Sequence, residues 1–509
     1  MAVDPGATPA GEAVGAPAEP SHIIALAKQT LVYGLSGVAI QAVGVVTLPV
    51  YGHVFTTSQF GLLELGTVVG ALALTLVDSG MASAAQRSFY DYHDDEEAAR
   101  RMVIFTALSY STAIGVLVAG TLAAASAPIS AWLLGNSDRQ PILLVVAASI
   151  PLINLASLLR ETMRLHFRAW HYVVSSALAS AVAAAASITL VVAFDQGVKG
   201  VFLGLLLGNG LAAVYGLLVV RQDIGRTFSW TELKRMLRYG LPLVPAAAAL
   251  WALAVIDRIM LEKLGSLSEV GQYAAANRVA NLLLLGVTGF ALAFGPYIFA
   301  MYSRDPELER TVRVQTLRYV AIGLSFGGLT LTLFSRQLLE LVAPGYGQAY
   351  RAVGLLVLAV VAFGVSTIVM AGIAYARRTE YVALTTLLAA GVNIGLNFAL
   401  IPPYGMIGAA IANVIAYLLL TATQYVLAQR VYRTAYEIGK LVTIVGIAAA
   451  LGVVGLVQLD AVVAEIAIKV AALAAFPLVL WATGIVSKQE LESLREVGSN
   501  LRRLRIVRA

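Results

Sequence analysis

Asn277, Arg278 and Asn281 are a cluster of polar side chains in a long apolar stretch at 270–300. On a helix that enters a membrane at the start of this stretch, Arg278 lies about 12 Å inward, at about 1.5 Å per residue. Asn281 is near the same helix face, because residues three apart are neighbours. A guanidinium can hold a phosphate through a fork of two hydrogen bonds. Arg278 is therefore a candidate ligand for a phosphorylated substrate, with Asn277 and Asn281 beside it. The alternative is an ion pair between helices, for example with Asp257.

Three further charged residues are candidates for ion coupling or for structural ion pairs: Asp78, Asp257 and Arg258. Ionisable side chains inside a membrane usually face a cavity or a partner. Asp257 and Arg258 are adjacent and point in different directions on a helix, so we expect them to have separate partners. Asp78 is a candidate for coupling to H⁺ or Na⁺, or for an ion pair with Arg87 or Arg164.

Other polar residues in apolar stretches have smaller expected roles. Gln41 is a further candidate for substrate contact, and so is Asn154. Lys469 is expected to extend its ammonium group outward to the membrane surface. Asn393 and Asn397 are expected to make hydrogen bonds between helices rather than to contact a substrate.

The amino-acid composition indicates whether these residues lie in a soluble protein or in a membrane protein. The chain has 509 residues, of which 59% are hydrophobic and only 13% are charged. In soluble domains about 45–50% of the residues are apolar and about 25% are charged. A lipid environment is implied, which excludes a soluble enzyme, a nucleic-acid-binding protein and a disordered scaffold. The absence of cysteine excludes disulfides and thiolate chemistry. None of the five histidines has the spacing of a metal site, so neither a metal nor a cofactor is predicted.

Apolar stretches of about 20 residues predict helices that cross the membrane. They predict an all-α polytopic membrane protein with fourteen spans, near 29–53, 61–83, 102–126, 141–160, 170–194, 198–220, 239–261, 270–300, 317–341, 350–374, 380–402, 404–429, 439–458 and 462–485. If both termini are cytoplasmic, most of the 35 Lys and Arg residues lie on the cytoplasmic side, as topology rules require. The predicted location is a bacterial cytoplasmic (inner) membrane.

Five arginines on that side are candidates for a ring at the cavity entrance that collects anionic lipid headgroups: Arg87, Arg164, Arg168, Arg377 and Arg378. The general excess of basic residues on the cytoplasmic side explains the same arginines equally well. Both interpretations stay open at this point.

Two halves of the chain repeat each other. Tyr33-Gly34 matches Tyr239-Gly240, Arg168-x-x-x-Tyr172-Val173 matches Arg377-x-x-x-Tyr381-Val382, and Gly197-x-x-Gly200 matches Gly405-x-x-Gly408, at offsets of 206, 209 and 208. Each copy holds six spans, so an axis along the membrane normal relates them. The predicted parts are a disordered cytoplasmic tail (1–25), an N-lobe (26–222), a C-lobe (223–430), two extra spans (431–486) and a basic cytoplasmic tail helix (487–509). A substrate cleft is expected between the lobes, with alternating access by rocking.

Several segments of the second half resemble bacterial polysaccharide flippases. They are Arg238-Tyr239-Gly240-Leu241-Pro242-Leu243-Val244-Pro245, Ile256-Asp257-Arg258, Val270-Gly271-Gln272-Tyr273 with Asn277-Arg278, Ala343-Pro344-Gly345-Tyr346, and the run from Asn393 to Ala410. The resemblance is to the Wzx-like oligosaccharide flippases of the multidrug/oligosaccharidyl-lipid/polysaccharide exporter superfamily. It covers roughly 25–430 and is most specific from 238 to 413.

This resemblance implies two six-helix bundles and a transporter rather than an enzyme. The implied substrate is an undecaprenyl-diphosphate-linked glycan, moved from the inner to the outer leaflet. The implied partners are membrane lipids, a polysaccharide polymerase and glycosyltransferases, and no nucleic acid.

Three alternatives remain. A lipid II flippase would differ mainly in substrate. A cation-coupled multidrug antiporter of the same superfamily would require buried carboxylates for a cationic substrate. A membrane glycosyltransferase or ligase acting on lipid-linked sugars would require large outer loops and catalytic carboxylates, whereas the predicted outer loops are short.

Overall fold

The computed structural model describes residues 47–93, 95–241, 244–376 and 378–485, and these residues form helices without a β-strand. The predicted tails 1–25 and 487–509 lie outside the described residues, as does Gln41. The all-α fold predicted from composition is confirmed.

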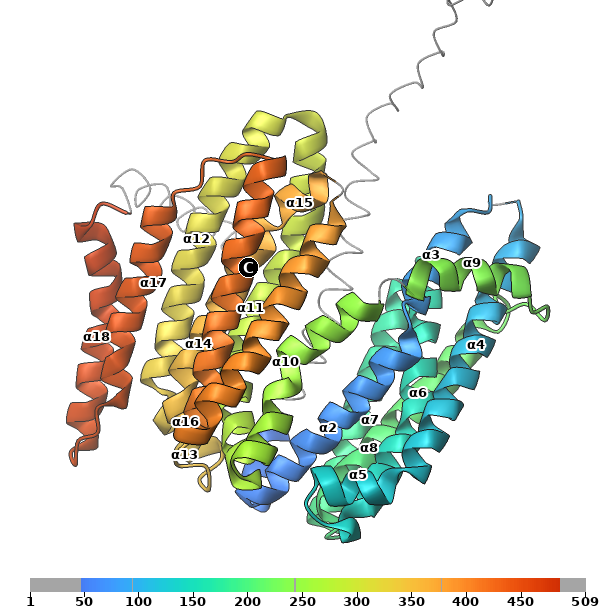
Figure 1. The fold of residues 1–509 in the computed structure, drawn as a ribbon, viewed down its shortest axis with the longest axis horizontal. Coiled ribbons are helices and arrows are strands. Elements are labelled where there is room, and N and C mark those ends of the chain that lie inside the picture. The colour runs from blue at the N-terminus through green and yellow to red at the C-terminus, as the bar shows by residue number, and fades with distance from the viewer. Residues whose placement is uncertain (1–46, 94, 242–243, 377, 486–509) are drawn as a thin grey trace, which may run out of the picture.

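One group of helices forms the N-lobe. Its members are α2 (Thr57–Asp78), α3 (Met81–Tyr90), α4 (Glu97–Ala124), α5 (Ser126–Leu133), the short η1 (Ser137–Arg139), α6 (Gln140–Leu165), α7 (Ala169–Val192) and α8 (Gly197–Val220). The helix α9 (Trp230–Gly240) leads from this lobe to the next and crosses the end of the bundle (Figure 1).

The second group forms the C-lobe. It comprises α10 (Val244–Leu264), α11 (Leu267–Arg304), α12 (Pro306–Leu333), α13 (Ser335–Val342), α14 (Tyr350–Val369), α15 (Ala371–Tyr375) and α16 (Thr379–Val431). The helices α17 (Ile438–Gly452), η3 (Val453–Leu456) and α18 (Val462–Ala482) follow, and α17 and α18 lie at the outer edge of the C-lobe, away from the N-lobe (Figure 1).

Eleven helices in the described ranges are long and apolar enough to cross a membrane. One of them, α16, has 53 residues and bends at Gly405, so it is two helices in succession. The span predicted near 29–53 lies mostly outside the described residues. The chain is thus a multi-pass membrane protein, and the count of fourteen spans stays a prediction.

The two halves share a turn, as the sequence repeat predicts. Gly197 and Gly405 have φ angles of 52° and 53°, a backbone conformation that residues with a Cβ rarely adopt. Three residues later, a methyl group on Gly408 would overlap with the Leu400 carbonyl oxygen, and one on Gly200 would lie 3.2 Å from the Leu190 Cβ. Matching glycines therefore permit the same close hairpin in each lobe.

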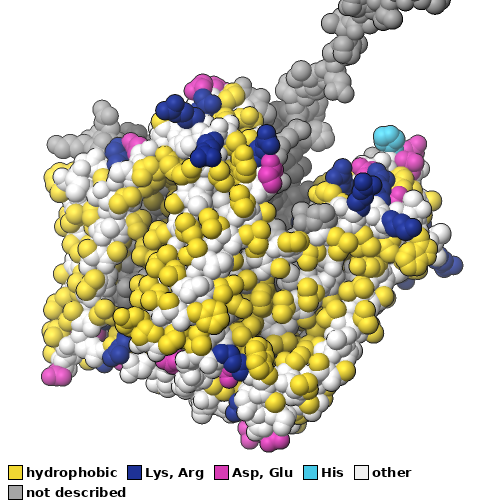
Figure 2. Space-filling view, in the orientation of Figure 1, with side chains coloured by type: hydrophobic (Ala, Val, Ile, Leu, Met, Phe, Trp, Pro, Cys, Tyr) yellow, Lys and Arg dark blue, Asp and Glu magenta, His cyan; other side chains and the backbone are white. Residues whose placement is uncertain are grey.

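The lobes meet at one end and diverge at the other (Figure 1). We call the diverging end the basic end, because Lys and Arg side chains gather on it over both lobes (Figure 2). The loops 166–168, 221–229 and 432–437 lie there. Apolar side chains cover the flanks between the two ends (Figure 2), as expected for surfaces that face lipid.

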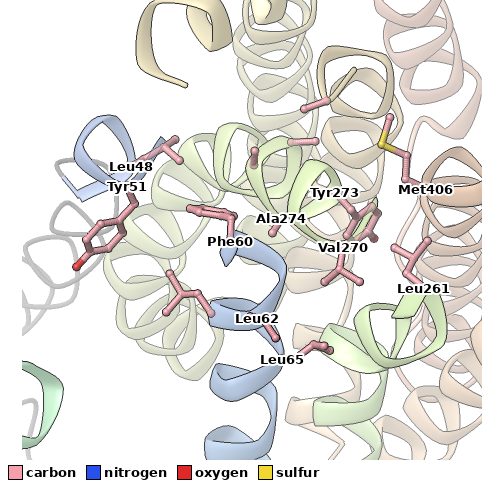
Figure 3. Close-up of a cluster of buried hydrophobic side chains, with 14 of the residues drawn as sticks. Leu48, Tyr51, Phe60, Leu62, Leu65, Leu261, Val270, Tyr273, Ala274 and Met406 are labelled. Atoms are coloured by element: carbon pink, nitrogen blue, oxygen red, sulfur yellow. The ribbon is translucent and has the colours of Figure 1, made fainter. Parts of the chain in front are cut away.

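At the opposite end the lobes pack closely along a seam between α2 and α11. Figure 3 shows Phe60 and Leu62 of α2 near Val270 and Ala274 of α11 in a buried apolar cluster. The two backbones touch, since a methyl group on Gly271 would overlap with the Thr57 carbonyl oxygen. This packing of α2 on α11 closes the space between the lobes at this end.

Candidate functional site

A cavity of about 610 Å³ lies between the N-lobe helices and α11 of the C-lobe. Its polar lining comes from hydroxyls, amides and two guanidinium groups: Thr47, Tyr51, Thr67, Arg160, Ser176, Ser180, Ser187, Asn209, Arg278 and Asn281. No carboxylate occurs among the described residues that line it. The chemistry of the wall is thus cationic and rich in hydrogen-bonding groups.

Arg278 lines this cavity, but its partner is not the predicted Asp257. Its Nη2 lies 2.9 Å from the Glu64 Oε1 of α2, and its guanidinium carbon lies 4.4 Å from the centre of the Phe60 ring. The pair therefore joins the two lobes. The side chain keeps 24% exposure, so part of the guanidinium remains available to the cavity. Asn281 also lines the cavity, whereas Asn277 is not among the lining residues.

Arg160 is a cavity residue that the sequence reasoning missed. The predicted span ended at residue 160, but α6 continues to Leu165, which places Arg160 more than one turn inside the helix. Its Nη1 atom is buried and has no hydrogen-bond partner. No carboxylate within the described ranges forms an ion pair with it, because the neighbouring Glu161 pairs with Arg164 at 2.5 Å. Arg160 thus brings to the cavity wall a guanidinium group with an unused hydrogen-bond donor.

The C-lobe holds a different arrangement, a buried network away from the cavity. The Arg258 Nη1 lies 2.9 Å from the Asp257 Oδ1, so the expectation of separate partners is wrong. The long Arg258 side chain folds back along its own helix, which sequence spacing does not reveal. The Tyr273 hydroxyl donates to the Asp257 Oδ2, and the Asn413 Nδ2 donates to the same oxygen at 3.1 Å.

Amide groups extend this network along α16. Asn393 donates to the Asn413 Oδ1 at 3.2 Å, and Asn397 donates to the Asn393 Oδ1 at 3.0 Å. The network therefore ties together α10, α11 and both parts of α16. This agrees with the predicted structural role of Asn393 and Asn397.

Two other expected ion contacts differ in the structure. Asp78 is exposed and, among the described residues, pairs with neither Arg87 nor Arg164: Arg164 pairs with Glu161, and Arg87 stacks on Tyr239. The expected ion pair of Asp78 is therefore wrong, and its role in ion coupling stays a prediction. Lys469 does not reach the membrane surface. It is fully buried, and its Nζ lies 2.7 Å from the Glu465 Oε1.

Asn154, a further candidate for substrate contact, is not among the residues that line the cavity. It is 8% exposed, and its Nδ2 donates to the Ser111 carbonyl oxygen at 3.3 Å.

Of the arginines predicted to form a ring, the four that the structure describes lie at the basic end, and none of these four lines the cavity. Arg168 makes two hydrogen bonds to Asp223, at 2.6 and 3.1 Å. Arg378 lies on the C-lobe, 3.2 Å from Glu380. Arg377 lies outside the described residues. A role for these arginines at the entrance stays a prediction.

Comparison with known proteins agrees with this architecture. Residues 26–302 match a family described as polysaccharide biosynthesis protein. The fold is similar to a lipid II flippase, MurJ, in an inward closed conformation, with a TM-score of 0.71 and 14% identity over 89% of this chain and 99% of that one. It is also similar to an inward-facing multidrug resistance transporter of the MATE family and the MOP superfamily, with a TM-score of 0.66 and 15% identity over 77% of this chain and 94% of that one. No curated protein matches the sequence.

Proposed function

The chain belongs to the polysaccharide biosynthesis protein family, and on this premise we propose that it moves an undecaprenyl-diphosphate-linked oligosaccharide from the inner to the outer leaflet. No covalent chemistry is needed. The protein binds the polar headgroup in its cavity and exchanges access between the two membrane faces by rocking of the lobes 26–222 and 223–430.

The observation on which this proposal rests is the charge of the side chains that line the cavity. Arg160 and Arg278 supply two guanidinium groups, of which Arg278 also pairs with Glu64, and no described lining residue supplies a carboxylate. A diphosphate carries the opposite charge and matches the fork of hydrogen-bond donors on a guanidinium. Serine and asparagine side chains on the same wall suit the hydroxyl groups of sugars, as with Ser176, Ser180 and Asn209.

The ion pair between Arg278 and Glu64 suggests how binding and movement are linked. Because the two residues come from different lobes, a diphosphate that replaces Glu64 on the guanidinium removes one contact across the seam. Ligands shift a conformational equilibrium only through such differential contacts. We therefore propose that substrate binding weakens the closed end of the cavity.

The direction of loading follows from charge. Basic residues of membrane proteins remain in the cytoplasm, so we place the basic end, where the lobes diverge, on the cytoplasmic side with both termini. In this orientation the described parts of the two lobes diverge toward the inner leaflet, from which we propose that the substrate is loaded.

The alternatives are less compatible with this wall. A multidrug antiporter for cationic substrates would need acidic groups in the cavity, where arginines occur instead. A ligase or glycosyltransferase would need carboxylates poised for proton transfer, which the described cavity wall also lacks. A lipid II flippase shares the diphosphate chemistry, and it remains the alternative that differs in the glycan.

The experiment that tests the proposal compares a variant that removes the positive charge of Arg278 with one that keeps it. In cells that make the lipid-linked oligosaccharide, Arg278→Ala should abolish its appearance in the outer leaflet, as an accessibility assay measures. Arg278→Lys should restore part of the activity, because an ammonium keeps the charge but loses the planar fork.

Arg101→Ala is a matched control at equal protein level, since Arg101 pairs with Glu97 away from the cavity. Full flipping by Arg278→Ala would contradict the proposal. So would export of a cationic dye by the wild-type protein without any flipping of the lipid-linked sugar.

A further inference from the structure

A second pocket lies at the basic end of the N-lobe, apart from the transport cavity. It has a volume of about 250 Å³ and lies between α3 and α9. Its charged lining consists of Arg87 of α3, Asp91 directly after α3, and Arg235 and Arg238 of α9. Three guanidinium groups therefore surround a small space that holds a single carboxylate.

The acidic groups of this region do not neutralise the pocket. Asp91 pairs with Arg235 at 2.8 Å, which leaves Arg87 and Arg238 without a carboxylate partner among the described residues. Arg87 stacks instead on the Tyr239 ring, with 4.8 Å between its guanidinium carbon and the ring centre. A cation over an aromatic face still has donors free for an anion.

The nearby Glu232 lies on the buried face of α9 and accepts a hydrogen bond there. The Tyr92 hydroxyl donates to its Oε1 at 2.7 Å, and this hydrogen bond raises the pKa of Tyr92 above its ordinary value. Glu232 is 6% exposed and lies on the side of α9 that packs against the bundle. Its Oε1 also lies 3.7 Å from the Arg235 Nη1, so Arg235 has two acidic partners. The guanidinium groups of the pocket that have no carboxylate partner among the described residues are those of Arg87 and Arg238.

The position of α9 points to the membrane surface. Leu233, Met236 and Gly240 of this helix are buried against the N-lobe, and Arg235 and Arg238 lie on the opposite, exposed face. Trp230, at the start of the helix, is 69% exposed. Exposed tryptophans and amphipathic helices with arginines on the polar face are typical of the headgroup layer. The candidate membrane span 57–90 also ends at this level.

Backbone contacts fix this pocket to a bend in the N-lobe. Ser79 and Gly80 have φ angles of 45° and 70° where α2 gives way to α3. A methyl group on Gly240 would lie 2.7 Å from the Ser79 carbonyl oxygen, so α9 ends directly against this bend. A ligand that bridges α3 and α9 would strengthen the same junction.

We propose that Arg87, Arg235 and Arg238 form a binding site for the phosphate of an anionic membrane lipid. The site lies outside the transport cavity and fixes α9 to the N-lobe just before the chain enters the C-lobe. The lipid is a structural ligand of the linker, and the proposal does not depend on which substrate is transported.

The test compares lipid retention in nanodiscs of defined composition. The wild-type protein in phosphatidylglycerol-containing discs should unfold at a higher temperature than in phosphatidylcholine discs and should retain phosphatidylglycerol in native mass spectrometry. Arg238→Gln should weaken retention about five-fold, the effect of one cation near an anionic surface, and Arg87→Gln with Arg238→Gln should weaken it further. Arg101→Gln, also at the basic end, should behave as wild type.

Two outcomes would overturn the proposal. In the first, Arg238→Gln and the double variant retain phosphatidylglycerol as the wild-type protein does. In the second, inorganic phosphate added to phosphatidylcholine discs gives the full thermal shift, which would assign the pocket to a soluble anion. Arg238 makes no described ion pair, so its substitution tests the site without removing a structural contact.

Discussion

Each lobe contains an arginine within its helices, Arg160 in α6 and Arg258 in α10, and their surroundings differ. Arg258 is 5% exposed and lies 2.9 Å from Asp257, which also accepts hydrogen bonds from Tyr273 and Asn413. Arg160 lies on the cavity wall, and its Nη1 has no partner. The two lobes therefore use the same side chain in different ways.

The two surroundings distinguish a charge that stabilises the fold from a charge that is available to a ligand. A buried charge is costly unless a partner and hydrogen bonds compensate it. The C-lobe supplies that compensation from its own residues. In the N-lobe the neighbouring Glu161 makes its short ion pair with Arg164 instead, so we expect the free donor of Arg160 to bind the anionic headgroup proposed above.

The largest expected effect comes from breaking the compensated pair. Asp257→Ala leaves Arg258 buried without its carboxylate, and we expect a loss of about 3–5 kcal/mol in the free energy of unfolding. A detergent-solubilised sample would show this as a lower unfolding temperature and low protein levels in the membrane. Replacing both residues, as Asp257→Ala with Arg258→Leu, should recover most of the loss. A single variant as stable as the wild-type protein would show that the network is not structural.

An intermediate effect, of a different kind, is expected in the N-lobe. Arg160→Leu removes no described ion pair, so the unfolding temperature should stay close to that of the wild-type protein. Flipping should fall roughly ten- to hundred-fold, because a hydrogen bond to a charged group contributes about 1.5–3 kcal/mol. Arg160→Lys should retain an intermediate rate in the same leaflet-accessibility assay. A large loss of stability without a specific loss of transport would make Arg160 a structural residue and remove the contrast.

The smallest effect concerns single amides in the two lobes. Asn397→Ala removes the last amide of the C-lobe network, and Asn154→Ala removes one hydrogen bond to the Ser111 carbonyl oxygen. Such bonds inside membranes contribute about 0.6 kcal/mol on average, so both variants should unfold within a few degrees of the wild-type protein. If Asn397→Ala is as damaging as Asp257→Ala, the C-lobe network acts as one unit rather than as separate contacts.

Local patterns predicted much of the fold. Apolar length predicted the helices, and the matched Gly-x-x-Gly segments of the repeat adopt the same turn at Gly197 and Gly405. These features depend on residues close in the sequence. The pairing of Arg278 with Glu64 does not, because 214 positions separate them and only the packing of α2 on α11 brings them together.

The remaining errors have separate physical causes. Arg160 was missed because the apolar stretch ends before the helix does, and a helix continues through charged residues when one face stays packed. Lys469 was expected at the surface, although Glu465 stands four residues earlier, a spacing that permits an ion pair on one helix face. For Arg258, the flexibility of the side chain allows contact with its own neighbour, which the direction of the Cβ atoms does not predict.

The glycine contacts at the closed end of the cavity have an electrical consequence. A bacterial membrane under a potential drives each elementary charge with about 2.3 kcal/mol per 100 mV, so a continuous water path through a transporter would dissipate that potential. At Gly61 and Gly271 the backbones of α2 and α11 touch directly, which leaves no room between them for a hydrated ion. The protein can therefore hold a cavity wide enough for a large polar headgroup open on one face while the membrane remains electrically insulated.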